Sequence, residues 1–369
     1  MIQSDNFLIL LRKQLGNRRR VTYADAIPHC LPHMRTSINI VLLALAAATF
    51  AVYLDWTQDR RSGPLLSDLR TLPIENHGQA GSAGNLLGIE TRLQPADYQS
   101  RERLQLKFRT YLKQAAEAGM LSERTVVVLP EHVGTGLFAL GEKPEVQQAR
   151  TLRDAMQWMA LSNPGGYLRA LPDNQGDDRR TGAVLRLKAR QMAEEYQNVF
   201  GGLAREFGVT LVAGSIVLPE PYLENDQLMI GDGPLRQVSL TFDGRGKPLG
   251  TLQYKQALSR YERRYSVAPI PERRRLIETP AGSLAVLLGC DAYLEQPPAE
   301  AKLLAVPGAL ADPQASCGST HSDALSARPH MAVHTLALPW NLLGSPRRPA
   351  PPGHGVPVQV RNQWLGSTP

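Results

Sequence analysis

Three residues that could together perform acyl transfer each stand at the end of an apolar segment. Glu131 follows Val-Val-Val-Leu-Pro, Lys255 follows Thr-Leu-Gln-Tyr, and Cys290 follows an apolar run that ends in Leu-Leu-Gly. A carboxylate can take the proton of a thiol, the thiolate can attack the carbon of an amide or nitrile, and an ammonium can stabilise the developing negative charge. Water, activated by the same carboxylate, then releases the acyl group. The three residue types therefore predict thiol-dependent acyl-transfer chemistry.

Each of these residues also has an ordinary structural explanation when it is taken alone. A cysteine after an apolar strand is more often a small buried apolar residue than a nucleophile. A glutamate at a strand end and a lysine on a strand are both commonly solvated. The order of the three residues along the chain, together with their similar contexts, favours the chemical interpretation.

The elements that must position these residues alternate between strand and helix. Apolar residues at helical spacing predict helices, and short apolar or β-branched runs predict buried strands. Over residues 243–246, Asp-Gly-Arg-Gly predicts a tight hairpin turn, because Asp and Gly tolerate positive φ angles. The alternation predicts an α/β layered fold, whose strand ends converge on one crevice. The predicted elements are a strand at 85–90, a helix at about 101–118, a strand at 125–129, an insertion over about 142–180, a helix at about 184–207, a strand at 209–218, a hairpin over 236–255 and a strand at 283–289.

Three motifs resemble those of the carbon–nitrogen hydrolase (nitrilase) superfamily. The sequence VVVLPEHVGTG is similar to the family's apolar strand ending in Pro-Glu, and DGRGKPLGTLQYKQAL is similar to its lysine hairpin. The third, LAVLLGCDAYLE, approaches the family's cysteine motif. The motifs occur in the family's order, and the resemblance runs from about residue 85 to about residue 295. It implies a nitrilase-type αββα sandwich.

The resemblance also implies a role for each site residue. Glu131 would be the general base, Lys255 the stabiliser of the transition state and Cys290 the nucleophile, with the backbone N–H of Asp291 as an oxyanion donor. The family carries a further glutamate shortly after the lysine, and Glu262 is the nearest candidate. Its context, Tyr-Glu-Arg-Arg, is equally typical of a solvated polar stretch. The mechanism requires no cofactor and no metal.

Three functions remain open on the sequence. The leading one is a hydrolase of non-peptide carbon–nitrogen bonds, acting on a small amide or nitrile. The second is a membrane-anchored N-acyltransferase similar to the apolipoprotein N-acyltransferases, although those proteins have several membrane spans and this sequence offers one apolar segment. The third is a catalytically silent binding module. The resemblance further suggests a homodimer, and no motif identifies the substrate.

An apolar segment near the N-terminus predicts membrane association. Residues 38–54 carry no charge, and basic residues are more numerous before this segment than after it. This asymmetry predicts a single transmembrane helix over about 38–56, in a bacterial-type inner membrane, with residues 1–37 in the cytoplasm and the main domain outside it. A cleaved secretory signal and a buried core helix are the alternatives, and Met34 is an alternative start.

The remaining boundaries follow from composition. Residues 57–84 are rich in Gly, Ser, Asp and Arg and predict a linker before a hydrolase domain at 85–310. Residues 311–369 are rich in proline and show little periodicity, which predicts an irregular tail. This tail is either native or the product of a reading-frame error, which would leave the sandwich incomplete.

Charge and cysteine content exclude other classes of protein. The net charge is +7, but the basic residues are spread along the chain apart from short arginine runs, so we do not expect nucleic-acid binding. The three cysteines, Cys30, Cys290 and Cys317, are too few and too scattered for a disulfide framework or a CxxC metal site. Each is therefore expected to be a lone thiol.

Overall fold

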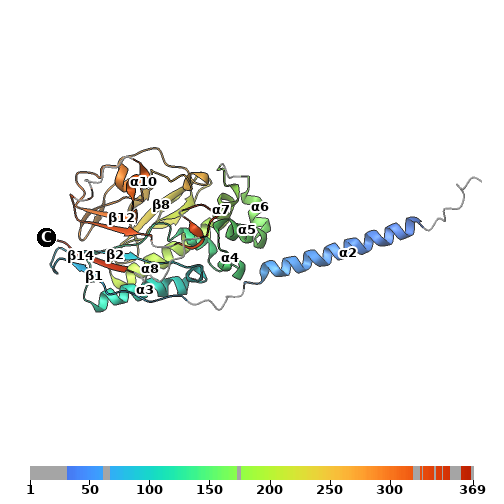
Figure 1. Ribbon diagram of the computed structural model, residues 1–369, viewed down its shortest axis with the longest axis horizontal. Coiled ribbons are helices and arrows are strands. Elements are labelled where there is room, and N and C mark those ends of the chain that lie inside the picture. The colour runs from blue at the N-terminus through green and yellow to red at the C-terminus, as the bar shows by residue number, and fades with distance from the viewer. Residues whose placement is uncertain are drawn as a thin grey trace, which may run out of the picture. The chain divides into compact units, whose positions relative to one another are not determined.

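The computed structural model describes residues 31–60, 67–172, 176–318, 325, 327–335, 338–342, 344–349 and 359–366. The chain divides into two compact units, Met1–Trp56 and Thr57–Pro369, whose elements are labelled in Figure 1. The predicted cytoplasmic segment before residue 31, including Cys30, lies outside the described residues.

The described part of the N-terminal unit is one helix, α2 (Leu31–Gln58). Its stretch Thr36–Gln58 has 23 residues and a mean hydropathy of 2.1, and none of the apolar window is buried. This helix is long enough and apolar enough to cross a membrane. A signal sequence would satisfy the same criteria.

A large mixed sheet forms the centre of the second unit. Its order is β1-β14-β2-β3-β4-β8-β5, and β9 pairs with β8. Strands β2, β3 and β4 are parallel, while β14 and β8 pair with this block in antiparallel fashion. The strands are β1 (Glu75–His77), β2 (Asn85–Glu90), β3 (Thr125–Val128), β4 (Thr210–Val212), β5 (Ile216–Pro219), β8 (Leu235–Phe242), β9 (Pro248–Tyr254) and β14 (Gln359–Trp364).

A second sheet, of order β10-β11-β12-β13, packs face to face against the first. Strands β11, β12 and β13 are parallel. Side chains of both sheets form one apolar layer, in which Val126 and Val212 meet Val286 and Val333. The strands are β10 (Ile277–Thr279), β11 (Gly282–Val286), β12 (Leu303–Ala309) and β13 (His330–His334), and a separate ribbon joins β6 (Tyr222–Glu224) to β7 (Gln227–Met229).

Helices cover the outer faces of both sheets. Helices α3 (Arg101–Glu117), α7 (Arg179–Tyr196) and α8 (Gly202–Phe207) bury their apolar faces against the large sheet. The short helices α9 (Asp291–Leu294) and α10 (Pro313–Cys317) lie outside the second sheet, and Figure 1 shows α3 and α10 on opposite sides of the two sheets. The predicted αββα sandwich is therefore confirmed.

Most predicted elements occur, with altered ends. The helix predicted at 184–207 begins earlier and contains a π-helical turn, Gln197–Gly201, before α8. The strand predicted at 209–218 is two strands, β4 and β5, divided at Gly214, which has φ +66°. The insertion at 142–180 contains the helices α4 (Pro144–Gln148), α5 (Leu152–Ser162) and α6 (Pro164–Ala170).

The segment after residue 310 differs from its prediction. Instead of an irregular tail, its described residues add β13 to the second sheet and β14 to the large sheet, where β14 lies between β1 and β2. The residues predicted as a linker supply β1, which pairs with β14. These strands are short and their partners are distant in sequence, so composition and local periodicity could not predict the pairing.

Candidate active site

Glu131 lies just beyond the carboxyl end of β3, where the backbone is tightly constrained. A Cβ atom at Gly214 would approach the carbonyl oxygen of Pro130 to 1.9 Å, so the turn between β4 and β5 requires glycine at this position. The Glu131 side chain is buried, and its Oε1 accepts a hydrogen bond from Gln237 Nε2 at 2.7 Å. The carboxylate is therefore held in one orientation.

Lys255 reaches the same carboxylate from the end of β9. Its Nζ lies 2.7 Å from Oε1 of Glu131 and 2.8 Å from Oε1 of Glu262, and only 4% of the residue is exposed. Burial opposes the charged form, but the two carboxylates outweigh it and raise the pKa of Lys255 well above its usual range. Lys255 is therefore a fixed positive charge.

Glu262 begins the short 3-10 helix Glu262–Arg264 and is fully buried. The solvated alternative for this residue is thus excluded. The backbone N–H of Ser259 donates to its Oε2 at 2.6 Å. Burial disfavours the carboxylate, yet Lys255 and His132 lower the pKa of Glu262 well below its usual range. Glu262 is therefore an ionised partner of Lys255.

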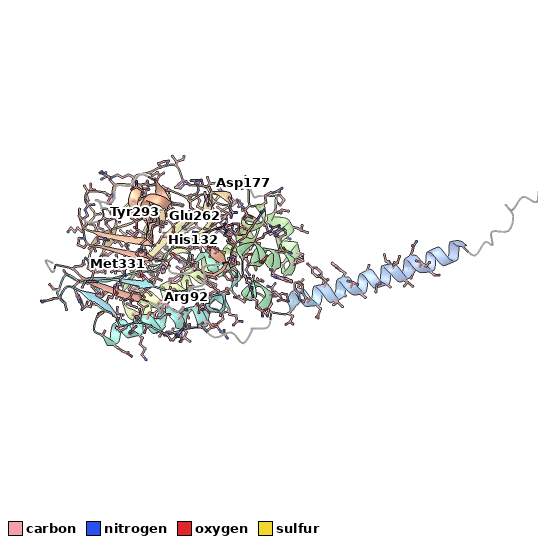
Figure 2. The ribbon with its side chains drawn as sticks, viewed as in Figure 1. Arg92, His132, Asp177, Glu262, Tyr293 and Met331 are labelled. Carbon is pink, nitrogen blue, oxygen red and sulfur yellow. A yellow bond between two sulfur atoms is a disulfide. The ribbon has the colours of Figure 1, made fainter. Side chains whose placement is uncertain are left out.

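His132 belongs to the same cluster, and sequence reasoning missed it. The ring is fully buried; Nε2 lies 2.8 Å from Glu262 Oε1, and Nδ1 lies 3.0 Å from Thr135 Oγ1. Adjacent residues of an extended chain point to opposite sides, so a neighbour of Glu131 is not expected beside it. His132 has φ +60°, which turns its ring back toward Glu262. Figure 2 shows the labelled side chains of His132 and Glu262 close together in the interior.

Cys290 follows β11 at the edge of this cluster. The residue before it, Gly289, is so close to the charged groups that a Cβ there would lie 3.0 Å from Lys255 Nζ and 3.1 Å from Glu131 Oε2. Cys290 is half-buried and forms a disulfide with Cys317. The prediction of lone thiols is therefore wrong for these two cysteines, because the fold places their Cα atoms 5.6 Å apart.

The side chain of Asp291 has a structural role, because it holds together three separate backbone and side-chain groups. Its buried carboxylate accepts hydrogen bonds from the backbone N–H groups of Gln256 and Ala257 and pairs with Arg274. Burial raises the pKa of Asp291 to about 6, although Arg274 opposes the shift. Its own N–H donates to the carbonyl of Leu288 at 3.0 Å. Its role as an oxyanion donor stays a prediction.

The cluster could also be considered as a metal site. Potential ligand atoms of Glu131, His132 and Glu262 all lie within 4.8 Å of one another. Nζ of Lys255 is within hydrogen-bonding distance of both carboxylates, so a metal ion would have to compete with the ammonium for them. The charge that a cation would supply is already provided by Lys255.

A cavity of about 600 Å³ lies beside β9. Its lining includes Gln256 and Arg274, which both contact Asp291, the residue after Cys290. Neither Lys255 nor Cys290 lines this cavity.

No protein-family model matches the chain, and no curated protein matches it. Among solved structures, a mutant amidase from Nesterenkonia sp. AN1, with the acetamide moiety of fluoroacetamide added covalently at its active-site cysteine, is 16% identical, with a TM-score of 0.37 over 64% of this chain and 68% of that chain. A carbon–nitrogen hydrolase from Helicobacter pylori is also 16% identical, with a TM-score of 0.37 over 62% of this chain and 60% of that chain. Another mutant of the Nesterenkonia amidase, described as a nitrilase-superfamily protein, is 17% identical, with a TM-score of 0.36 over 63% of this chain and 68% of that chain.

Proposed function

We propose that the chain is a thiol-dependent hydrolase of non-peptide carbon–nitrogen bonds, acting on an amide or a nitrile. The observation that carries the proposal is the buried cluster of Glu131, Lys255 and Glu262, packed directly against the residue before Cys290. With Cys290 reduced, these segments, which are far apart in the sequence, would supply the general base, the fixed cation and the thiol that acyl transfer requires.

The first half of the reaction forms a covalent intermediate. Glu131 takes the proton of the Cys290 thiol, and the thiolate attacks the amide carbon to form a carbon–sulfur bond. Lys255 stabilises the charge on the substrate oxygen, and the backbone N–H of Asp291 would join it once its hydrogen bond to the carbonyl of Leu288 opens. The carbon–nitrogen bond then breaks, and the proton held by Glu131 passes to the departing amine.

The second half restores the enzyme. Glu131 takes a proton from water, the hydroxide attacks the thioester, and the carbon–sulfur bond breaks to release the acid. The Cys290 thiolate takes the proton back from Glu131, which restores the thiol and the carboxylate. Because Lys255 is held by two carboxylates and keeps its charge, it serves as a stabiliser of negative charge and not as a proton donor.

Glu262 and His132 are positioning residues in this scheme. Glu262 fixes the Lys255 ammonium at 2.8 Å, and His132 Nε2 contacts the same carboxylate oxygen, Oε1 of Glu262, also at 2.8 Å. The two carboxylates around the one ammonium give the three side chains Glu131, Lys255 and Glu262 a net charge of −1.

We also propose where in the cell the enzyme is located. Helix α2 would anchor the hydrolase in a bacterial-type inner membrane with the catalytic unit on the extracytoplasmic side, as the distribution of basic residues predicts. Release after cleavage of a signal sequence is the alternative. The substrate would be a small amide or nitrile.

The test is turnover of a panel of simple amides and nitriles by the full chain in detergent with dithiothreitol. Mass spectrometry would follow an acyl adduct, and Cys290→Ala would be compared with Cys317→Ala, which removes the other thiol of the pair. Turnover and adduct that disappear only in Cys290→Ala support the proposal. A folded, reduced protein with neither turnover nor adduct contradicts it and favours a binding module.

A further inference from the structure

The disulfide between Cys290 and Cys317 results from the parallel pairing of two neighbouring strands. Cys290 follows β11, and Cys317 ends helix α10, which follows β12. Since parallel neighbours end at the same edge of a sheet, the segments that follow β11 and β12 emerge side by side. The backbone hydrogen bond from Gly289 N–H to the carbonyl of Pro307, at 3.0 Å, extends this pairing toward Cys290.

Contacts other than the disulfide also hold the two segments together. The N–H of Leu310 donates to the hydroxyl oxygen of Tyr293 at 3.1 Å, joining the chain after β12 to helix α9. Cys317 packs against the apolar cluster that contains Ala292 and Tyr293. Both sulfur atoms would therefore remain neighbours after reduction, so the bond can form again.

The bond has a chemical consequence for the proposed function. A sulfur atom in a disulfide has no proton to give to Glu131 and no free electron pair of a thiolate for attack. We propose that the Cys290–Cys317 disulfide is an inactive, oxidised form of the enzyme, and that exchange with a dithiol reductant at Cys317 releases the Cys290 thiolate. This inference rests on the proposed function of Cys290.

The exchange proceeds in two balanced steps. A thiolate of the reductant attacks Sγ of Cys317, the bond between the two protein sulfurs breaks, and its electron pair leaves on Cys290. The second thiolate of the reductant then attacks the reductant's own sulfur in the mixed disulfide and releases Cys317 as a thiolate. The protein disulfide gains two electrons, and the dithiol is oxidised to its disulfide.

The surroundings of the two cysteines favour attack at Cys317. Its neighbours Ser316 and Gly318 are exposed, whereas Cys290 lies between buried residues, Gly289 and Asp291. Access therefore selects Cys317 as the sulfur that is attacked.

The experiment uses the full chain in detergent, equilibrated with either oxidised or reduced dithiothreitol. Peptide mapping after iodoacetamide would follow Cys290 and Cys317 separately, alongside amide turnover. We expect the oxidised wild type to give a Cys290–Cys317 cross-linked peptide, no alkylation of Cys290 and a loss of turnover of at least about a hundredfold, as expected for a missing nucleophile. Reduced dithiothreitol should restore both alkylation and turnover.

The variants Cys317→Ser and Cys317→Ala cannot form the disulfide, so they distinguish redox control of Cys290 from damage to the fold. Both should keep Cys290 alkylated and turnover unchanged in the two buffers. Glutathione added to the oxidised wild type should leave its mixed disulfide on Cys317. A wild type without the cross-linked peptide in the oxidising buffer, or with the cross-link and full turnover, overturns the inference. A third outcome separates the two proposals. If Cys290 is alkylated only after reduction but the protein hydrolyses no substrate, the disulfide exchange is supported and the proposed hydrolase function is contradicted.

Discussion

The two halves of the candidate site are built differently. On the large sheet, Glu131, Lys255 and Glu262 are nearly inaccessible and joined by short ionic contacts. Beside the second sheet, Cys290 and Cys317 are half-buried; Cys290 immediately precedes the short helix α9, and Cys317 ends the short helix α10. The charged half, Glu131, Lys255 and Glu262, is thus fixed by its own mutual contacts, whereas the sulfur half, Cys290 and Cys317, changes its covalent state in the proposed exchange. Substitutions in each half should therefore have unequal effects.

The largest effect is expected for Lys255→Met. It leaves the two carboxylates of Glu131 and Glu262 buried without their cation, which should lower the free energy of unfolding by about 3–5 kcal/mol. Lys247→Met breaks an exposed pair with Asp226 and should cost no more than about 1 kcal/mol. Urea denaturation measures both. Equal costs would remove the distinction between a fixed charged half and an ordinary surface pair.

A smaller effect is expected for Gly214→Ala, which tests the support beneath Glu131. The new Cβ would meet the carbonyl oxygen of Pro130, and the positive φ adds strain, so we expect a cost above about 1 kcal/mol and a lower kcat. Gly119→Ala has nearly the same φ, +69°, with no atom within 4 Å of the new Cβ. The difference in stability between the two variants, measured by thermal denaturation, gives the cost of the contact between the new Cβ and the carbonyl oxygen of Pro130. If they lose the same stability, the close approach does not constrain Glu131.

Acid should weaken the charged half through Glu262. Its pKa is lowered on folding from an ordinary value of 4.5, so the unfolded chain binds the proton more readily. The stabilisation is therefore complete above that value and is lost as the pH falls through and below it. We expect the stability difference between wild type and Glu262→Gln to shrink from pH 7 to pH 3 in urea titrations. A difference that stays constant or grows on acidification contradicts the assigned ionisation.

The smallest effect is expected for Cys317→Ser in the reduced protein. The side chain is half-buried and borders an apolar cluster, so the free energy of unfolding should change by less than about 1 kcal/mol. In the oxidised protein the same variant loses a cross-link that spans 27 residues, and the cost should rise to about 3 kcal/mol. Guanidinium titrations in the two buffers measure both. A large cost under reduction would mean that the sulfur half is as rigid as the charged half.

Sequence patterns were sufficient where a local signal is strong. Helix α3 has an apolar face at helical spacing and a serine, Ser100, that caps its first turn, and the hairpin of β8 and β9 has turn residues that permit its geometry. The patterns failed for strands whose place in the sheet depends on a partner far away in the sequence. Strand β14 looks unremarkable in sequence, yet it is held by register with β2, more than two hundred and fifty residues earlier in the chain.

The amino-acid sequence by itself determined which chemical groups are available and their order: an acid after β3, an amine after β9 and a thiol after β11. Only the tertiary structure decided their relations. It placed Glu262 beside Lys255 and His132 beside Glu262, because a 3-10 turn and a positive φ angle reorient residues that no periodicity assigns to an interior. It also joined Cys290 to Cys317, because parallel strands bring their ends to one edge whatever the sequence distance between them.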